Sequence, residues 1–141
     1  YGIADVWAAV GTVMPGMEIV DARYLDYTRL DTPTLIADDF FDAGCVLGPE
    51  TPWSGAPALE GVIGVTRING IEAGRGRGAD VMGHPLHALC WLANQRAARG
   101  EGLAAGEFVF LGSVVETKWV APGDHVVMEL AGLGTVEAVF D

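Results

Sequence analysis

The 141-residue chain carries 19 acidic and 8 basic residues, which gives a formal net charge of −11. This negative excess excludes a nucleic-acid backbone or an anionic membrane surface as partner, because each requires a cationic face. Half of the residues are apolar, yet no apolar run reaches the roughly 18 to 20 residues of a membrane span. Length and composition therefore predict one soluble, well-packed domain over residues 1–141.

The two cysteines favour an intracellular location. Cys45 and Cys90 each lie in an apolar segment and form no CxxC or Cys/His metal pattern. They are expected to be buried free thiols of a cytoplasmic protein. No signal peptide is visible, and the chain begins at Tyr1 without a methionine, so we expect an amino-terminal region upstream.

Helix and strand patterns alternate through the first half of the chain. Asp5 is expected to cap a helix that ends before Pro15-Gly16, because apolar residues follow it at helical spacing. Thr32 followed by Pro33 predicts the start of a second, short helix. The other expected elements are strands over residues 17–24, 43–47 (buried) and 59–68, with a loop over residues 49–57.

The second half opens with a hairpin signal, Asn69-Gly70, between two apolar segments. The glycine-rich stretch GRGRGADVMG (74–83) is predicted to be irregular. Pro85 opens the clearest helix, over residues 86–99. Four strands are then expected, over residues 108–111, 113–120, 125–130 and 135–140. These elements predict a β-rich α+β domain with at most three helices.

Glu18 is the residue whose pattern says most about chemistry. It lies in the middle of an otherwise apolar predicted strand, where a carboxylate is costly to bury unless a cation compensates its charge. Two partners fit this pattern. One is an arginine, either Arg23 or one from another strand, and the other is a metal ion.

Five stretches of the chain resemble one known family, in the same order and with the same spacing. They are MPGMEIVDARYLDY, IADDFFDAGCVLG, RINGIEAGRGRGADVMGHPLHALCWLAN, AGEFVFLGSVVETKWVAPGD and AGLGTVEAVF. They resemble the C-terminal portion of the 2-keto-4-pentenoate hydratase and 4-oxalocrotonate decarboxylase family, within the fumarylacetoacetate hydrolase superfamily. The resemblance implies an α+β fold, a β-rich mixed sheet roll or sandwich with two to three short helices.

The resemblance also implies a metal site. In the family, the Glu of the Glu-Ile-Val-Asp motif is one of three carboxylates that hold a divalent cation, Mg²⁺ or Mn²⁺, and it falls on Glu18. The other two ligands come from a Glu-x-Glu pair upstream, as does a lysine usually assigned as catalytic base. Residues 1–141 are therefore expected to be the C-terminal catalytic portion of a longer enzyme, inactive when isolated.

Three further residues are implied near the substrate. Phe41 and Asp42 stand where many family members carry two serines, and this departure is expected to reshape the pocket and change its polarity. The alternative is that Phe41 lies in the core and Asp42 in solvent. Ser113, after Gly112, falls where the superfamily places a hydroxyl residue near the carboxylate of the substrate.

The implied activity is that of a hydro-lyase acting on a short unsaturated 2-keto acid. It converts 2-keto-4-pentenoate to 4-hydroxy-2-oxopentanoate in the meta-cleavage catabolism of aromatic compounds, and the family tends to form homo-oligomers. One alternative is 4-oxalocrotonate decarboxylase, which uses the same metal and enolate chemistry to lose CO₂. Another is a non-catalytic paralogue or partner subunit that keeps the fold without the site.

Overall fold

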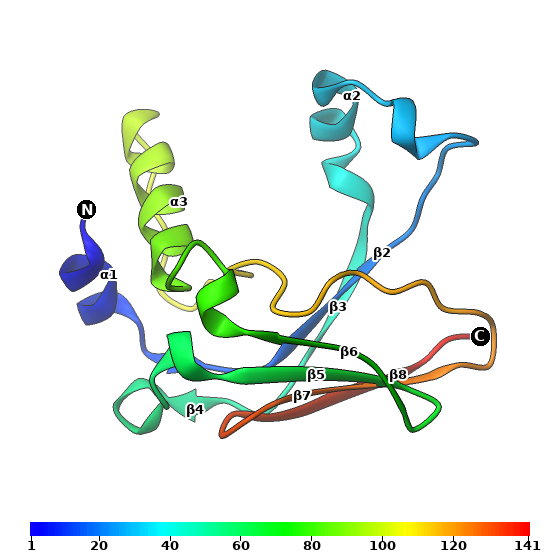
Figure 1. Cartoon of the computed structure of the whole chain (residues 1–141). Coiled ribbons are helices and arrows are strands. Elements are labelled where there is room, and N and C mark those ends of the chain that lie inside the picture. Colours follow the sequence, from blue (N-terminus) through cyan, green and yellow to red (C-terminus); the bar gives the residue numbers. More distant parts are fainter.

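The computed structural model describes residues 1–141 and confirms the α+β class, with three α-helices and three small sheets (Figure 1). Every strand pair is antiparallel. The helices are α1 (Ile3–Ala9), α2 (Thr32–Ala37) and α3 (Leu86–Ala98). The strands are β1 (Thr12–Val13), β2 (Gly16–Val20), β3 (Asp42–Leu47), β4 (Thr51–Pro52), β5 (Ile63–Ile68), β6 (Ile71–Arg77), β7 (His125–Leu130) and β8 (Gly134–Val139).

Two sheets organise the molecule. The larger has the strand order β6-β5-β7-β8, and the β5–β6 connection is the predicted hairpin. Asn69 and Gly70 both adopt positive φ, 52° and 81°, as the two-residue turn requires. The smaller sheet pairs β2 with β3 in a ribbon that extends towards α2 (Figure 1). Strand β3 is not buried as expected, because alternate residues along it are exposed.

The helix starts differ from those predicted. Asp5 occupies the third position of α1, and its carboxylate accepts a hydrogen bond from the Gly2 N–H at 2.8 Å. The helix stops at Ala9, so strand β1 fits in before Pro15. Helix α2 is capped by Asp31, whose carboxylate accepts from the Thr34 N–H at 3.0 Å, and not by Thr32. Carboxylates compete with hydroxyls for these free N–H groups.

The prediction of an irregular glycine-rich stretch over residues 74–83 is wrong in its first part only: residues 74–77 belong to strand β6, whereas residues 78–83 form a 3-10 turn followed by a further turn. Gly74 and Gly76 alternate along β6, so they share one face of the sheet. Gly76 pairs with Gly64 of β5, and a Cβ atom on Gly76 would lie 1.7 Å from the Val114 carbonyl oxygen. The absence of a Cβ atom at these glycines therefore allows Val114 to pack directly against the sheet.

Residues 99–124, which include Val114, form no strand. The predicted strands 108–111 and 113–120 are wrong, because no backbone–backbone hydrogen bond joins residues 108–120 to any other part of the chain. Figure 1 shows the segment, coloured yellow to orange, crossing the sheet. Its apolar alternation reflects contact with that face, and a segment lying on a face has no strand edge to pair with.

The core is small for the length of the chain. Only 14 of 141 residues are buried, with one cluster of Leu59, Val62 and Leu133, so the expectation of a well-packed interior is wrong. The accessible surface is 8789 Å², whereas a compact monomer of this mass exposes about 7,000 Å². Large apolar side chains such as Leu25 and Trp91 stay exposed. No helix has the length and apolar character needed to cross a membrane.

Candidate functional site

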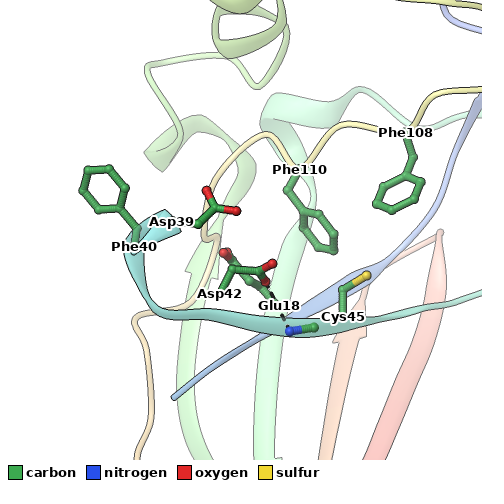
Figure 2. Close-up of a pocket in the computed structure, with 8 residues that line it drawn as sticks. Glu18, Asp39, Phe40, Asp42, Cys45, Phe108 and Phe110 are labelled. Atoms are coloured by element: carbon green, nitrogen blue, oxygen red, sulfur yellow. Dashed lines mark hydrogen bonds between the residues drawn. The ribbon is translucent and has the colours of Figure 1, made fainter. Parts of the chain in front are cut away.

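A pocket of about 370 Å³ opens beside the β2–β3 ribbon, and three parts of the chain form its wall. Strand β2 supplies one carboxylate, and strand β3 supplies another carboxylate and a thiol. The turn before β3 supplies a third carboxylate and one aromatic ring. The segment that crosses the sheet supplies two further aromatic rings. The lining residues are Glu18, Asp39, Phe40, Asp42, Gly44, Cys45, Phe108 and Phe110 (Figure 2).

Glu18 lies in the middle of β2, directly opposite Cys45 of β3. Its side chain is exposed to the pocket and not buried, which corrects the expectation that burial demands a counter-ion. It forms no ion pair, because Arg23 instead binds Asp38 at 3.1 Å. Cys45 is also exposed, against the expectation of a buried thiol. Glu18 is thus a free carboxylate in a pocket.

The carboxylates of Glu18, Asp39 and Asp42 give the pocket oxygen donors of one sign (Figure 2). Carboxylate oxygens are the ligands that Mg²⁺ and Mn²⁺ prefer, so this donor chemistry fits a hard divalent cation. No group of three or more His, Cys, Asp or Glu side chains in the chain could itself hold a metal ion. A cation at Glu18 would therefore need ligands other than a ready-made cluster of these side chains.

Asp42 and Phe41 end up in different surroundings. Asp42 lines the pocket, and its carboxylate accepts a hydrogen bond from the Gly44 N–H at 3.2 Å. The Phe41 ring lies outside the pocket, with its centroid 6.2 Å from those of Tyr24 and Tyr27. Phe40 borders the pocket in its place. The backbone turns left-handed at residues 39–41, so the side chains do not alternate as they would along a strand.

The carboxylate of Asp38 stabilises the turn at residues 39–41 through hydrogen bonds. It accepts hydrogen bonds from the Arg23 guanidinium, from the Tyr24 hydroxyl at 3.1 Å and from the Phe41 N–H at 3.1 Å. These bonds, the Arg23 bond foremost, hold the pKa of Asp38 below its usual value. Desolvation, followed by the bond to Asp38, raises the pKa of Tyr24. Asp38 is thus ionised at neutral pH and available as a permanent acceptor.

Ser113 does not line this pocket. It is exposed in the irregular segment, directly after Gly112, whose φ is +116°. It borders a larger, mainly apolar cleft of about 960 Å³ that also reaches Glu18. Ser113 and Glu18 therefore face one cleft, without sharing the smaller pocket.

Glycines decide where the segment with Phe110 and Ser113 lies. A Cβ on Gly16 would fall 2.7 Å from the Phe110 ring, so this glycine leaves room for the ring beside β2. Gly64 and Gly76 likewise leave room for Val114, because a Cβ on either would lie within 3 Å of its atoms. Sequence reasoning missed six of the eight lining residues, namely Asp39, Phe40, Gly44, Cys45, Phe108 and Phe110. The alternating glycines of GRGRG were nevertheless a usable signal for a close chain crossing.

Comparison with known proteins gives consistent matches along the chain. The sequence model of the family described as fumarylacetoacetate (FAA) hydrolase C-terminal matches residues 2–141. A 4-oxalocrotonate decarboxylase from Pseudomonas putida is 36% identical over 138 residues, 98% of this chain and 52% of the relative. A 2-hydroxyhexa-2,4-dienoate hydratase from Comamonas testosteroni is 35% identical over 136 residues, 96% of this chain and 51% of the relative.

A solved structure shares the fold. It is the 4-oxalocrotonate decarboxylase from Pseudomonas putida G7, complexed with magnesium and adipate, with a TM-score of 0.91 and 34% identity. The match covers 99% of this chain and 52% of that one. The chain thus spans about half the length of the relatives it matches, and those relatives include both a hydratase and decarboxylases.

Proposed function

Because the chain belongs to the fumarylacetoacetate hydrolase C-terminal family, we propose that the natural protein is a divalent-cation-dependent hydratase of a short unsaturated 2-keto acid. The proposed reaction adds water to 2-keto-4-pentenoate, with the hydroxyl at C4 and the proton at C5, to give 4-hydroxy-2-oxopentanoate. The observation that carries the proposal is Glu18, an unpaired carboxylate that lines a pocket and stands where the family resemblance implies a metal ligand.

Four residues of the chain would bind the cation and the substrate. Glu18 would hold Mg²⁺ or Mn²⁺ together with ligands from outside these residues. A bound cation supplies Lewis-acid polarisation of the 2-oxo group. Phe108 and Phe110 would contact the apolar tail and exclude water from it. Ser113 would donate a hydrogen bond to the substrate carboxylate from the adjoining cleft.

Asp42 remains in the proposal as a residue of the substrate pocket, and Phe41 does not, because its ring packs against Tyr24 and Tyr27. We also propose that the natural protein is cytoplasmic. The homo-oligomeric state is kept too, since a second copy would cover apolar side chains that this chain leaves exposed.

Charge favours the hydratase over the decarboxylase. The pocket lining holds three carboxylates and no lysine, arginine or histidine. A substrate with a second carboxylate, such as 4-oxalocrotonate, would bring that charge towards like charges. The alternative is the decarboxylase, because the relatives that resemble this chain include proteins of both names.

One experiment separates the two activities. The natural protein with Mg²⁺ is incubated in turn with 2-keto-4-pentenoate and with 4-oxalocrotonate, while NMR follows 4-hydroxy-2-oxopentanoate and a separate assay follows CO₂. Hydration of the first substrate, without CO₂ release from the second, is expected. Release of CO₂ without hydration would replace the proposal by the decarboxylase, and no turnover of either substrate would leave a non-catalytic paralogue.

Asp42 should set the preference for monocarboxylates. Two carboxylates about 4 Å apart repel by roughly 1 to 4 kcal/mol at effective dielectrics of 80 to 20. Asp42→Ser should therefore raise kcat/KM for a dicarboxylate, relative to 2-keto-4-pentenoate, by about tenfold. Asp42→Asn keeps the side-chain volume and should have the same effect if charge is the cause. A wild-type protein that already prefers the dicarboxylate would place Asp42 away from the substrate tail.

A further inference from the structure

The turn that carries the pocket residues has an unusual backbone. Asp39, Phe40 and Phe41 have φ values of 57°, 51° and 69°, so three successive residues other than glycine lie in the left-handed region. A Cβ atom disfavours this region, and such residues ordinarily occur there singly. A run of three persists only when surrounding contacts hold it in place.

Arg23 supplies most of those contacts and reaches both ends of the turn. Its guanidinium donates to the Asp38 carbonyl oxygen at 3.0 Å and, from two nitrogens, to the Asp42 carbonyl oxygen at 3.1 Å. It also donates to both carboxylate oxygens of Asp38, at 3.1 and 3.2 Å. The two carbonyl groups flank the left-handed residues, so one planar side chain closes the turn.

The same contact fixes the turn relative to β2. Arg23 lies five residues after Glu18 in sequence, beyond the end of β2, and the Asp21 N–H donates to the Phe41 carbonyl oxygen at 2.9 Å. The β2–β3 register also shifts between Ile19 and Val20, where the turn joins β3. The strand that carries Glu18 is thus tied to the turn at its far end.

We propose that Arg23 is a positioning residue: it holds the left-handed turn so that the carboxylates of Asp39 and Asp42 line the same pocket as Glu18. This inference rests on the proposed cation site at Glu18. A lysine could not replace Arg23 fully, because one ammonium group lacks the planar fork that reaches two carbonyl groups and a carboxylate together. Loss of Arg23 should displace the carboxylates of Asp39 and Asp42. The pocket should then attract a cation less strongly.

The test compares Mn²⁺ binding to variants of the natural protein by electron paramagnetic resonance titration. Arg23→Gln should raise the Mn²⁺ dissociation constant about tenfold, and Arg23→Lys should recover only part of that loss. Arg75→Gln is the matched control, because Arg75 forms an exposed ion pair with Glu72 at 2.9 Å away from the pocket. It should bind Mn²⁺ within about twofold of the wild-type protein.

Two readouts separate positioning from general stability. Circular dichroism gives the folded fraction at the titration temperature, and amide exchange of Phe41 and Gly44 reports the turn itself, since both N–H groups are hydrogen-bonded there. Faster exchange confined to the turn, with the protein folded, is expected in Arg23→Gln.

The outcomes distinguish this inference from the proposed function. Wild-type Mn²⁺ affinity in Arg23→Gln, complete recovery in Arg23→Lys, or a loss that only follows the unfolded fraction would overturn the positioning role. For the last case, Asp38→Asn offers a second way to loosen the same turn. If Glu18→Gln itself binds Mn²⁺ like the wild type, the cation site has failed, whatever Arg23 does.

Discussion

Replacement of Glu18 by glutamine should lower turnover of 2-keto-4-pentenoate by at least about a hundredfold in the natural protein. Glutamine keeps the size of the side chain and one oxygen, but it removes the charge that would neutralise a divalent cation. The Mg²⁺ concentration that gives half-maximal activity should rise at the same time. A titration of activity with Mg²⁺ in both proteins measures the two effects together.

The fold should survive this substitution. Glu18 makes no ion pair and is exposed to the pocket, so its charge contributes little to stability. Glu50→Gln is a suitable control, because Glu50 borders the larger cleft without lining the smaller pocket. Unchanged activity in Glu18→Gln would refute the ligand assignment. Unfolding of that variant would instead indicate a structural role for the carboxylate.

Elements set by short-range signals could be predicted well. The Asn69-Gly70 turn needs only two residues that tolerate positive φ, and strand β7 follows its predicted bounds, His125–Leu130. Residues 108–120 show the limit of such signals. Their apolar alternation predicts a half-buried strand, but a strand also needs a free edge elsewhere in the sheet, and these residues lie over a face.

The candidate site was predictable only in part, for a related reason. The interruption of an apolar strand by a carboxylate singled out Glu18, but its assignment as a metal ligand and the placement of Asp42 near the substrate both come from the family resemblance. Phe40 could not be distinguished from Phe41, because three left-handed residues between α2 and β3 redirect both rings. Phe110 reaches the pocket through a chain crossing that depends on glycines far away in the sequence.

Substitution of Gly76 by alanine should destabilise the protein by roughly 3 kcal/mol or more. The added Cβ would lie 1.7 Å from the carbonyl oxygen of Val114 and 2.9 Å from its carbonyl carbon, and both atoms belong to backbone. Neither can rotate away as a side chain could, so residues around Val114 must lift from the sheet. Because Phe110 lies four residues before Val114, the pocket should open as well.

Thermal unfolding measures the effect, and an apparent Tm about 10 °C lower is expected for a domain of this size. Gly61→Ala is the matched control, since a Cβ there meets no atom within 4 Å and the residue is not at positive φ. It should be neutral or slightly stabilising, because alanine restricts the unfolded chain more than glycine does. Gly64→Ala should fall between the two, since its Cβ would meet the Val114 and Leu130 side chains, at 2.8 and 3.0 Å. A Gly76→Ala protein as stable as Gly61→Ala would mean that residues 108–120 do not rest on this face of the sheet.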